Sequence, residues 1–222
     1  MKVPFYQVAL GTLAALAVAG VLIVVSWTGS HSQSSLTPAG MPVRGMEKGW
    51  PDAKVTIIEY SDFQCPWCGL FARTTARQIE DEYVKTGKVK IVYRNFAFLG
   101  QESILAAEAA ECASEQNLFW PYHDRLFESQ AGENKGAFRG DKLRQLAADV
   151  GLDTSSFDSC FDSPGTLQKV VDSREEGRGL GVRSTPTFII NGRLLVGAQP
   201  FEVFKAVIER ELLGLDGTAT PR

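Results

Sequence analysis

The motif Cys65-Pro66-Trp67-Cys68 constrains the fold of this chain more than any other part of its sequence. The run Lys54–Tyr60 shortly before the motif is rich in β-branched residues, which is typical of a buried strand. Inside the motif, Pro66 favours the start of a helix, because proline is common at the first helical position. The helix that begins at Pro66 is predicted to continue to about Lys85, and Val89–Tyr93 is predicted to form a second strand. The pattern therefore predicts a right-handed, parallel strand–helix–strand unit with two thiols at the start of its helix.

The position of the motif predicts different roles for its two cysteines. Unsatisfied backbone N–H groups at a helix N-terminus stabilise an anion, so the pKa of Cys65 is expected to lie below the free value of about 8.5. We therefore predict that Cys65 is the nucleophile. Cys68, one turn into the helix, is expected to be more buried and to resolve the mixed disulfide. The two thiols would form a redox-active disulfide.

A zinc half-site and a pair of structural cysteines are the alternative interpretations of the motif. A zinc site needs about four ligands. The other cysteines, Cys112 and Cys160, have no two-residue spacing, and His31 lies in a polar segment near the N-terminus. We therefore predict a redox motif and no metal site.

Glu59 lies inside the first predicted strand, six residues before Cys65. If that strand is central, burial would raise the pKa of the carboxyl group and suit it to exchange a proton with Cys68. The alternative is that Glu59 reaches the edge of the sheet or pairs with a lysine. Glu59 is therefore a candidate proton relay.

Thr185 and Pro186 stand immediately before Thr187–Ile190, which has the pattern of a strand. Proline costs little at this position because it need not donate to the ladder. A cis peptide bond here would turn the backbone toward the sulfur atoms and leave the Thr185 amide available to an extended peptide. From the residues alone, a trans bond is the commoner state, since about 5–6% of such bonds are cis.

The rest of the chain divides into a helical block and a second strand region. Residues from about 102 to 179 have helical periodicity and are too numerous for a loop, so they should pack on their own. Asn191-Gly192 predicts a hairpin turn between Thr187–Ile190 and Leu194–Val196, and Pro200–Leu213 predicts a closing helix. The element order is β-α-β, a helical insertion and β-β-α.

The N-terminal region predicts a membrane anchor. Val8–Trp27 is 20 residues long and carries no charge, which is the length of a helix that crosses a bilayer. A cleaved signal peptide is the alternative, but the apolar run continues to Val25, past the small residues that could form a cleavage site. Lys2 places the N-terminus in the cytoplasm and the catalytic domain outside it. The predicted location is thus the cell membrane, with a single pass.

These patterns predict the boundaries of each region. Residues 1–27 form the anchor, 28–48 a flexible linker, 49–213 the catalytic domain with its insertion at about 102–180, and 214–222 a tail. The chain has 222 residues, of which 44% are hydrophobic, so it is not disordered as a whole. Its formal charge of 23 − 26 = −3 gives no electrostatic case for nucleic-acid binding.

Several motifs resemble segments of the DsbA-like thioredoxin-fold proteins, in the same order. They are Val55–Cys68, Tyr93–Phe96, Ala109–Ala113, Phe119–Asp124 and Ser184–Gly192. The resemblance covers about Gly49 to Leu213. It implies an α/β thioredoxin fold with an inserted helical domain, preceded here by the predicted transmembrane helix, and a cis bond between Thr185 and Pro186.

The resemblance also implies a function. It implies an enzyme outside the cytoplasm that exchanges thiols and disulfides with the cysteines of secreted or membrane proteins, usually as an oxidant. Electrons pass through sulfur, so no cofactor is implied. A quinone-linked membrane reoxidase of the DsbB or VKOR type is the implied partner, and the protein is expected to be a monomer.

The motif departs from the strongly oxidising family members, which have a histidine directly before the second cysteine. Trp67 cannot stabilise the thiolate through charge, so a disulfide reductase or isomerase of the same fold remains an alternative. A non-catalytic peptide-binding or chaperone module is the other alternative. Trp67 is expected near the surface, where it could contact an unfolded substrate or a partner protein.

Cys112 and Cys160 lie in the helical block. An oxidising compartment and an even number of cysteines favour a structural disulfide between them. Two buried free thiols, or a redox-active pair that tunes Cys65, are the alternatives. Nearby aromatic side chains are expected in the core of the insertion. His123 is expected to be a capping or surface residue and not a catalytic one. The aromatic residues are Phe119, Trp120, Tyr122 and Phe127.

Overall fold

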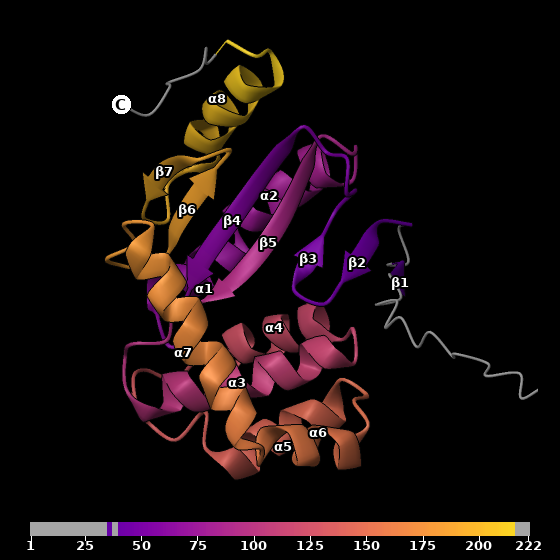
Figure 1. Ribbon diagram of the computed structural model, residues 1–222, viewed down its shortest axis with the longest axis vertical. Helices are drawn as coiled ribbons and strands as arrows, with labels where there is room; N and C mark the ends of the chain where they lie inside the picture. The colour runs from indigo at the N-terminus through magenta and orange to yellow at the C-terminus, as the bar shows by residue number, and fades with distance from the viewer. Residues whose placement is uncertain (1–34, 37–39, 216–222) are drawn as a thin grey trace, which may run out of the picture. The chain divides into compact units, whose positions relative to one another are not determined.

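The computed structural model describes residues 35–36 and 40–215, and within them one seven-stranded mixed sheet is surrounded by helices (Figure 1). The strand order is β1-β2-β3-β5-β4-β6-β7. The strands are β1 (Ser35–Leu36), β2 (Pro42–Arg44), β3 (Glu47–Lys48), β4 (Val55–Ser61), β5 (Val89–Asn95), β6 (Thr187–Ile190) and β7 (Arg193–Val196). β4 is parallel to β5 and antiparallel to β6, so it is a central strand.

Helices connect the strands and build the insertion. The first group is α1 (Pro66–Arg73), α2 (Thr75–Ile79) and a π-helical turn, η1 (Glu80–Val84). The insertion contains α3 (Gln101–Glu115), α4 (Phe119–Glu128), α5 (Gly140–Asp149), α6 (Thr154–Phe161) and α7 (Pro164–Gly179). The last helix is α8 (Phe201–Leu212). This arrangement confirms the predicted α/β fold with an inserted helical domain.

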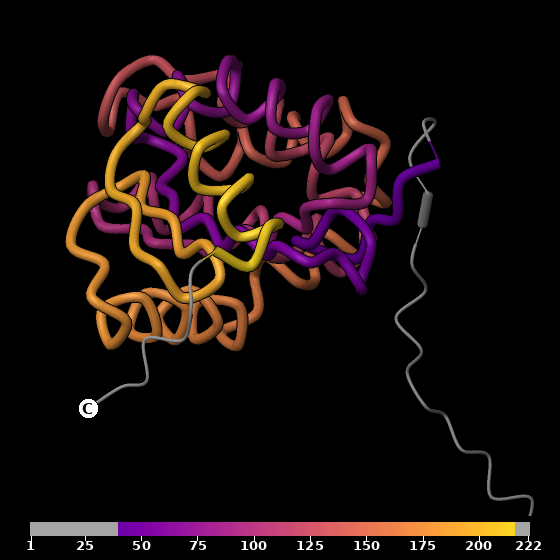
Figure 2. The backbone as a smooth tube through the Cα atoms, turned by 90° about the horizontal axis from the view of Figure 1, so that it is seen from above, coloured from indigo at the N-terminus to yellow at the C-terminus, as the bar shows by residue number. Residues whose placement is uncertain are grey.

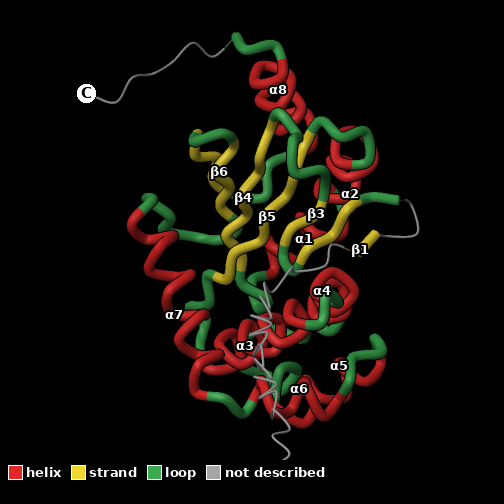
Figure 3. The backbone as a smooth tube through the Cα atoms, turned by 45° about the vertical axis from the view of Figure 1, so that its right-hand side comes forward, coloured by secondary structure: helices red, strands yellow, loops and turns green. Residues whose placement is uncertain are grey.

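The helices cover both faces of the sheet, and α3–α6 lie beyond one of its ends (Figure 3). Ile57 faces the core that the sheet forms with α1, α2, η1 and α8, through Phe71, Ile79 and Phe204. Tyr60 points to the other face, where it packs with Phe96. In Figure 2, α7 (orange) accordingly lies on the opposite side of the sheet from α8 (yellow). Because side chains alternate along β4, Glu59 and Ser61 share the face of Ile57.

The structure differs from the sequence prediction at two places. Residues 42–48, the end of the predicted linker, form β2 and β3, and β3 pairs with β5. These strands have two or three residues each, too short for a strand pattern in the sequence. The helix predicted from Pro66 to Lys85 is interrupted at Thr74, whose φ and ψ of −122° and −84° are not helical.

The predicted anchor, Val8–Trp27, lies outside the described residues, as does the tail from residue 216 onward. Within residues 35–36 and 40–215, no helix is long and apolar enough to cross a membrane. The hairpin turn is as predicted: Asn191 and Gly192 have φ values of 46° and 89°, the left-handed conformation that such a turn requires.

Gly177 allows α7 to approach the sheet closely. A Cβ atom there would lie 2.8 Å from the Tyr60 ring and 3.0 Å from the Phe96 ring. We expect Gly177→Ala to lower the free energy of unfolding by about 1–3 kcal/mol, the usual cost of overpacking. Gly179 in the same helix is the matched control, because a Cβ there meets nothing within 4 Å. Gly179→Ala should be neutral or stabilise by up to about 1 kcal/mol. Urea denaturation measures both, and equal effects would contradict the close approach.

Candidate active site

Cys65 lies at the N-terminus of α1, as the sequence predicts. It is the N-cap residue, with φ −69° and ψ 120°, and Pro66 occupies the first helical turn. The Cys65 amide donates to the Asp62 carbonyl at 3.0 Å, which closes the turn between β4 and α1. Both Cys65 and Cys68 are thiols in this structure.

The two thiols differ strongly in their tendency to ionise. Hydrogen bonding from the Cys68 thiol is the main cause that lowers the pKa of Cys65 to about 6, and the backbone N–H groups of Trp67 and Cys68 add to it. Burial opposes this effect. Burial is the main cause that raises the pKa of Cys68 well above its ordinary value, and the neighbouring Cys65 sulfur raises it further. The geometry therefore supports Cys65 as the thiolate nucleophile and Cys68 as the protonated partner.

Thr185 and Pro186 lie beside Cys65, and the peptide bond between them is cis, as the family resemblance implies. The Cys65 thiol donates to the Thr185 carbonyl at 3.4 Å. The Thr185 hydroxyl lowers the pKa of Cys65. It has no hydrogen-bond partner among the residues that the structure describes. That hydroxyl is therefore available to donate to a thiolate at Cys65.

Glu59 is buried in the middle of the sheet, with only 4% of the residue exposed. Its register partners are Tyr93 on β5 and Phe188 on β6, so it does not reach a sheet edge. Burial raises the pKa of Glu59 to about 7, against the opposing effects of the Ser61 hydroxyl and the Lys48 charge. Lys48 itself pairs with Glu80 at 2.6 Å.

Ser61 lies close to both Glu59 and Cys68, and its hydroxyl has no hydrogen-bond partner in the described part of the chain. It lies two residues further along β4 on the same face, and it is fully buried. Its hydroxyl lowers the pKa values of both Glu59 and Cys68. The structure thus brings Glu59, Ser61 and Cys68 into one buried row.

Trp67 lies at the surface beside Cys65, as expected, with 62% of the residue exposed. No group of three or more histidine, cysteine, aspartate or glutamate residues that could hold a metal ion occurs in residues 35–36 and 40–215. The candidate site therefore consists of the two thiols, the Thr185–Pro186 segment and the buried acid.

A buried polar network that the sequence analysis missed holds the loop before Cys65. The Asp62 carboxylate accepts hydrogen bonds from the Ser103 hydroxyl at 2.6 Å and from the amides of Gln64 and Phe98 at 2.8 and 2.9 Å. The Gln130 side chain donates to the carbonyls of Phe63 and Cys65 at 2.8 and 2.9 Å. These bonds join α3, the loop after β5 and the loop after α4 to the segment between β4 and α1 that carries Cys65. The polar residues beside the motif were visible in the sequence, but their distant partners were not.

The helical insertion contains the predicted disulfide. Cys112 in α3 and Cys160 in α6 are bonded, with an S–S distance of 2.07 Å. This finding excludes two free thiols. The aromatic residues Phe119, Tyr122 and Phe127 are buried, as expected.

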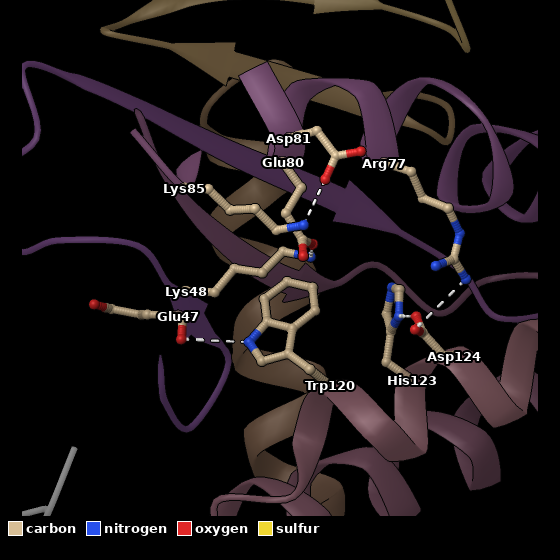
Figure 4. A network of polar contacts seen from close by, with 9 residues as sticks. All are labelled: Glu47, Lys48, Arg77, Glu80, Asp81, Lys85, Trp120, His123 and Asp124. Carbon is tan, nitrogen blue, oxygen red and sulfur yellow. Dashed lines mark hydrogen bonds and ion pairs between the residues drawn. The ribbon is translucent and has the colours of Figure 1, made fainter. Parts of the chain in front are cut away.

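The expected capping or surface position of His123 was wrong. Only 4% of the residue is exposed, and its ring packs against those of Phe63, Tyr93 and Phe127. Figure 4 shows the ring beside Asp124. His123 belongs to the buried stripe of α4, which also contains residues 119, 122, 126 and 127. That helical spacing was the signal in the sequence that places His123 inside.

Comparisons with known proteins agree with this geometry. A protein-family model described as thioredoxin matches residues 43–210. The chain is 30% identical over 169 residues to "Probable disulfide bond formation protein D" of Bacillus anthracis, covering 74% of this chain and 76% of that protein. It is 28% identical over 178 residues to "Disulfide bond formation protein D" of Bacillus subtilis, covering 79% and 78%.

Solved structures show the same fold. The oxidised form of BdbD from Bacillus subtilis has a TM-score of 0.71 and 27% identity, covering 82% of this chain and 99% of that one. Alpha-DsbA1 from Wolbachia pipientis has a TM-score of 0.69 at 23% identity, covering 81% and 94%, which is a likeness of fold. This chain belongs to the DsbA-like family of thioredoxin-fold thiol–disulfide oxidoreductases.

Proposed function

We propose that this oxidoreductase works outside the cytoplasm and oxidises cysteine pairs in secreted or membrane proteins. The observation that carries the proposal is the contrast between the lowered pKa of Cys65 and the raised pKa of Cys68. A stabilised thiolate favours the reduced form of the enzyme, so its disulfide accepts electrons more readily.

The reaction requires two exchanges at the motif. A substrate thiolate attacks Cys65 in the Cys65–Cys68 disulfide, and Cys68 leaves and takes up a proton. The second substrate thiolate then attacks the substrate sulfur of the mixed disulfide and releases Cys65 as a thiolate. The substrate loses two electrons and gains a disulfide, and the enzyme becomes a dithiol.

Thr185, Pro186 and Trp67 are proposed to position the substrate. β6 begins at Thr187, so the Thr185 amide lies beyond the ladder and can pair with an extended peptide. Trp67 offers an exposed aromatic surface next to the nucleophile. Glu59 is proposed to give Cys68 its proton and to take it back when the enzyme is reoxidised.

Location and partners complete the proposal. The uncharged segment Val8–Trp27 would anchor the protein in the membrane, and the Cys112–Cys160 disulfide is typical of an oxidising compartment. A quinone-linked membrane reoxidase of the DsbB or VKOR type would return the enzyme to its disulfide form. The protein is proposed to act as a monomer.

Equilibration of the full-length protein with glutathione buffers tests the direction of electron flow. The pKa of Cys65, about 6, lies between that of thioredoxin, about 7, and that of DsbA, about 3.5. We therefore expect a potential between their values of about −270 and −120 mV. A value at or below about −270 mV would overturn the proposed oxidase function and favour a reductase.

Glu59→Gln should change how stability depends on pH. The pKa of Glu59 is about 7 in the folded protein and 4.5 as its ordinary value. A raised carboxyl pKa contributes stability that is complete below pH 4.5 and is lost as the pH rises through 7. The loss amounts to about 3 kcal/mol.

Denaturant unfolding of both reduced proteins at pH 4 and pH 8 measures this effect. The free energy of unfolding of Glu59→Gln, relative to the wild type, should rise by about 3 kcal/mol between the two pH values. Titration of Cys65 is common to both proteins and cancels in the comparison. A difference that does not vary with pH would show that Glu59 has the same pKa in the folded and the unfolded protein, which would contradict the raised value.

A further inference from the structure

A small cavity lies on the face of β4 that carries Glu59. Its volume is about 30 Å³, and its lining includes Glu59 from β4, Ala72 from α1, Trp120 from α4 and Ile91 from β5. Such a volume is enough for one water molecule, which needs about 10–15 Å³. The charged and titratable groups around it come from five elements: Lys48 on β3, Glu59 on β4, Arg77 on α2, Glu80 on η1, and His123 and Asp124 on α4.

Two buried atoms in this lining have no hydrogen-bond partner in the described part of the chain. They are Oε1 of Glu59 and Nε2 of His123. Buried polar atoms are almost always satisfied by protein or by ordered water, and leaving them unpaired costs free energy. A water molecule between a carboxyl group and an imidazole nitrogen would satisfy both.

The other ring nitrogen of His123, Nδ1, contacts a side chain that reaches the surface. Nδ1 lies 2.9 Å from Oδ1 of Asp124, and Oδ2 of Asp124 lies 3.7 Å from Arg77 (Figure 4). The Asp124 side chain is 46% exposed and that of Arg77 is 59% exposed, so this end of the row reaches solvent.

The protonation states fit a relay. His123 lowers the pKa of Asp124, which keeps that carboxylate ionised although its burial acts in the opposite direction. An ionised carboxylate can only accept, so Nδ1 of His123 carries the hydrogen and Nε2 is a bare acceptor. Burial lowers the pKa of His123, which keeps the imidazole neutral.

Lys48 is held away from this row. Its ammonium group donates a hydrogen bond to the Glu80 carboxylate at 2.6 Å and lies 4.0 Å from the centre of the Trp120 ring (Figure 4). Because Lys48 is engaged by Glu80 and Trp120, its ammonium group does not occupy Nε2 of His123. Nε2 therefore remains a hydrogen-bond acceptor in the lining of the cavity.

We propose that a water molecule in this cavity joins Glu59 to His123, and that His123 and Asp124 pass the proton of the exchange reaction between Glu59 and solvent. The inference rests on the proposed role of Glu59. When Cys68 must lose its proton, Glu59 accepts it and hands a proton to the water. The water gives one to Nε2 of His123, and Nδ1 releases one to Asp124 and solvent. One proton leaves Cys68 and one reaches solvent, with no change in oxidation state along the relay.

His123→Gln tests this proposal, because glutamine keeps a polar group but cannot carry a proton at neutral pH. Tyr122→Phe is the matched control: Tyr122 is the preceding residue of α4, and its hydroxyl donates to the Leu143 carbonyl instead of facing the cavity. The full-length wild type, both variants, Glu59→Gln and the double variant Glu59→Gln/His123→Gln are compared. The steady-state rate of oxidation of a dithiol peptide is measured from pH 6 to 8 with oxidised glutathione as the limiting oxidant, so that reoxidation, in which Cys68 loses its proton, sets the rate. The equilibrium with glutathione is measured over the same range.

We expect His123→Gln to slow peptide oxidation about tenfold or more, within the range that proton transfer contributes. The glutathione equilibrium should stay unchanged, because a relay alters the rate and not the end states. Tyr122→Phe should retain the wild-type rate, and His123→Gln should have no further effect in the Glu59→Gln background. A rate within twofold of the wild type, or equal slowing in both backgrounds, would overturn the relay while leaving the proposed function intact. A wild type that does not oxidise the peptide would overturn the proposed function itself.

Nitrogen NMR of the wild type tests the proposal without any variant. The chain has two histidines, so the signals of His123 can be assigned. We expect neutral His123 to carry its hydrogen on Nδ1. A hydrogen on Nε2 would contradict the proposed acceptor.

Discussion

Replacement of Cys65 with serine is expected to reduce dithiol–disulfide exchange to the uncatalysed rate, a loss of about a thousandfold or more. A serine hydroxyl cannot form a disulfide, so neither the Cys65–Cys68 disulfide nor a mixed disulfide at position 65 can form. Oxidation of a dithiol peptide by the full-length protein measures this loss. A non-catalytic peptide-binding or chaperone module would instead retain its function in the variant.

Cys68→Ser is the matched variant, because it keeps the nucleophile and removes the resolving thiol. When the reduced variant is treated with oxidised glutathione, the Cys65 thiolate attacks that disulfide and releases one glutathione thiolate. The mixed disulfide at Cys65 should then accumulate and be visible as a mass increase of the intact protein, which a reductant reverses. The assignment rests on the buried position and raised pKa of Cys68 against the lowered pKa of Cys65. If Cys65→Ser accumulated mixed disulfides and Cys68→Ser did not, the two roles would be reversed.

Local signals account for the parts of the fold that could be predicted from the sequence. The β-branched run of β4, the proline at the start of α1 and the Asn191-Gly192 turn each act within a few residues. β2 and β3 were missed because two or three residues show no periodicity. Their place follows from pairing, of β3 with β5 and of β2 with β3. The interruption between α1 and α2 at Thr74 was also missed, because no glycine or proline marks it in the sequence.

The candidate site divides in the same way. Cys65, Cys68 and Glu59 belong to one continuous segment, so their spacing predicts their proximity. The Asp62 carboxylate, by contrast, meets Ser103 across 41 positions of the chain, and no local pattern fixes such a contact. The cavity beside Glu59 is of this second kind, because β3, β4, α2 and α4 all contribute to it.

Removal of the second disulfide should have the largest effect on stability. Cys112 and Cys160 are 48 positions apart, and closing a loop of that length restricts the unfolded chain. The chain-entropy estimate is about 4 kcal/mol, and measured losses are often smaller. We therefore expect Cys112→Ala/Cys160→Ala to lower the free energy of unfolding by about 2–4 kcal/mol. Denaturant unfolding measures it, with Cys65 and Cys68 in the same redox state in both proteins.

Ser159→Ala controls for substitution on α6, because this exposed side chain donates a hydrogen bond to the Ser155 carbonyl of its own helix. It should change stability by less than about 0.5 kcal/mol. A loss of less than about 1 kcal/mol in the double variant would contradict a structural role for the bond. The potential of Cys65–Cys68 in the double variant separates that role from redox tuning. The main groups that shift the pKa values of Cys65 and Cys68 are the two thiols themselves, Thr185, Ser61 and nearby backbone groups, so the potential should stay unchanged. A shifted potential would make the second disulfide part of the redox machinery.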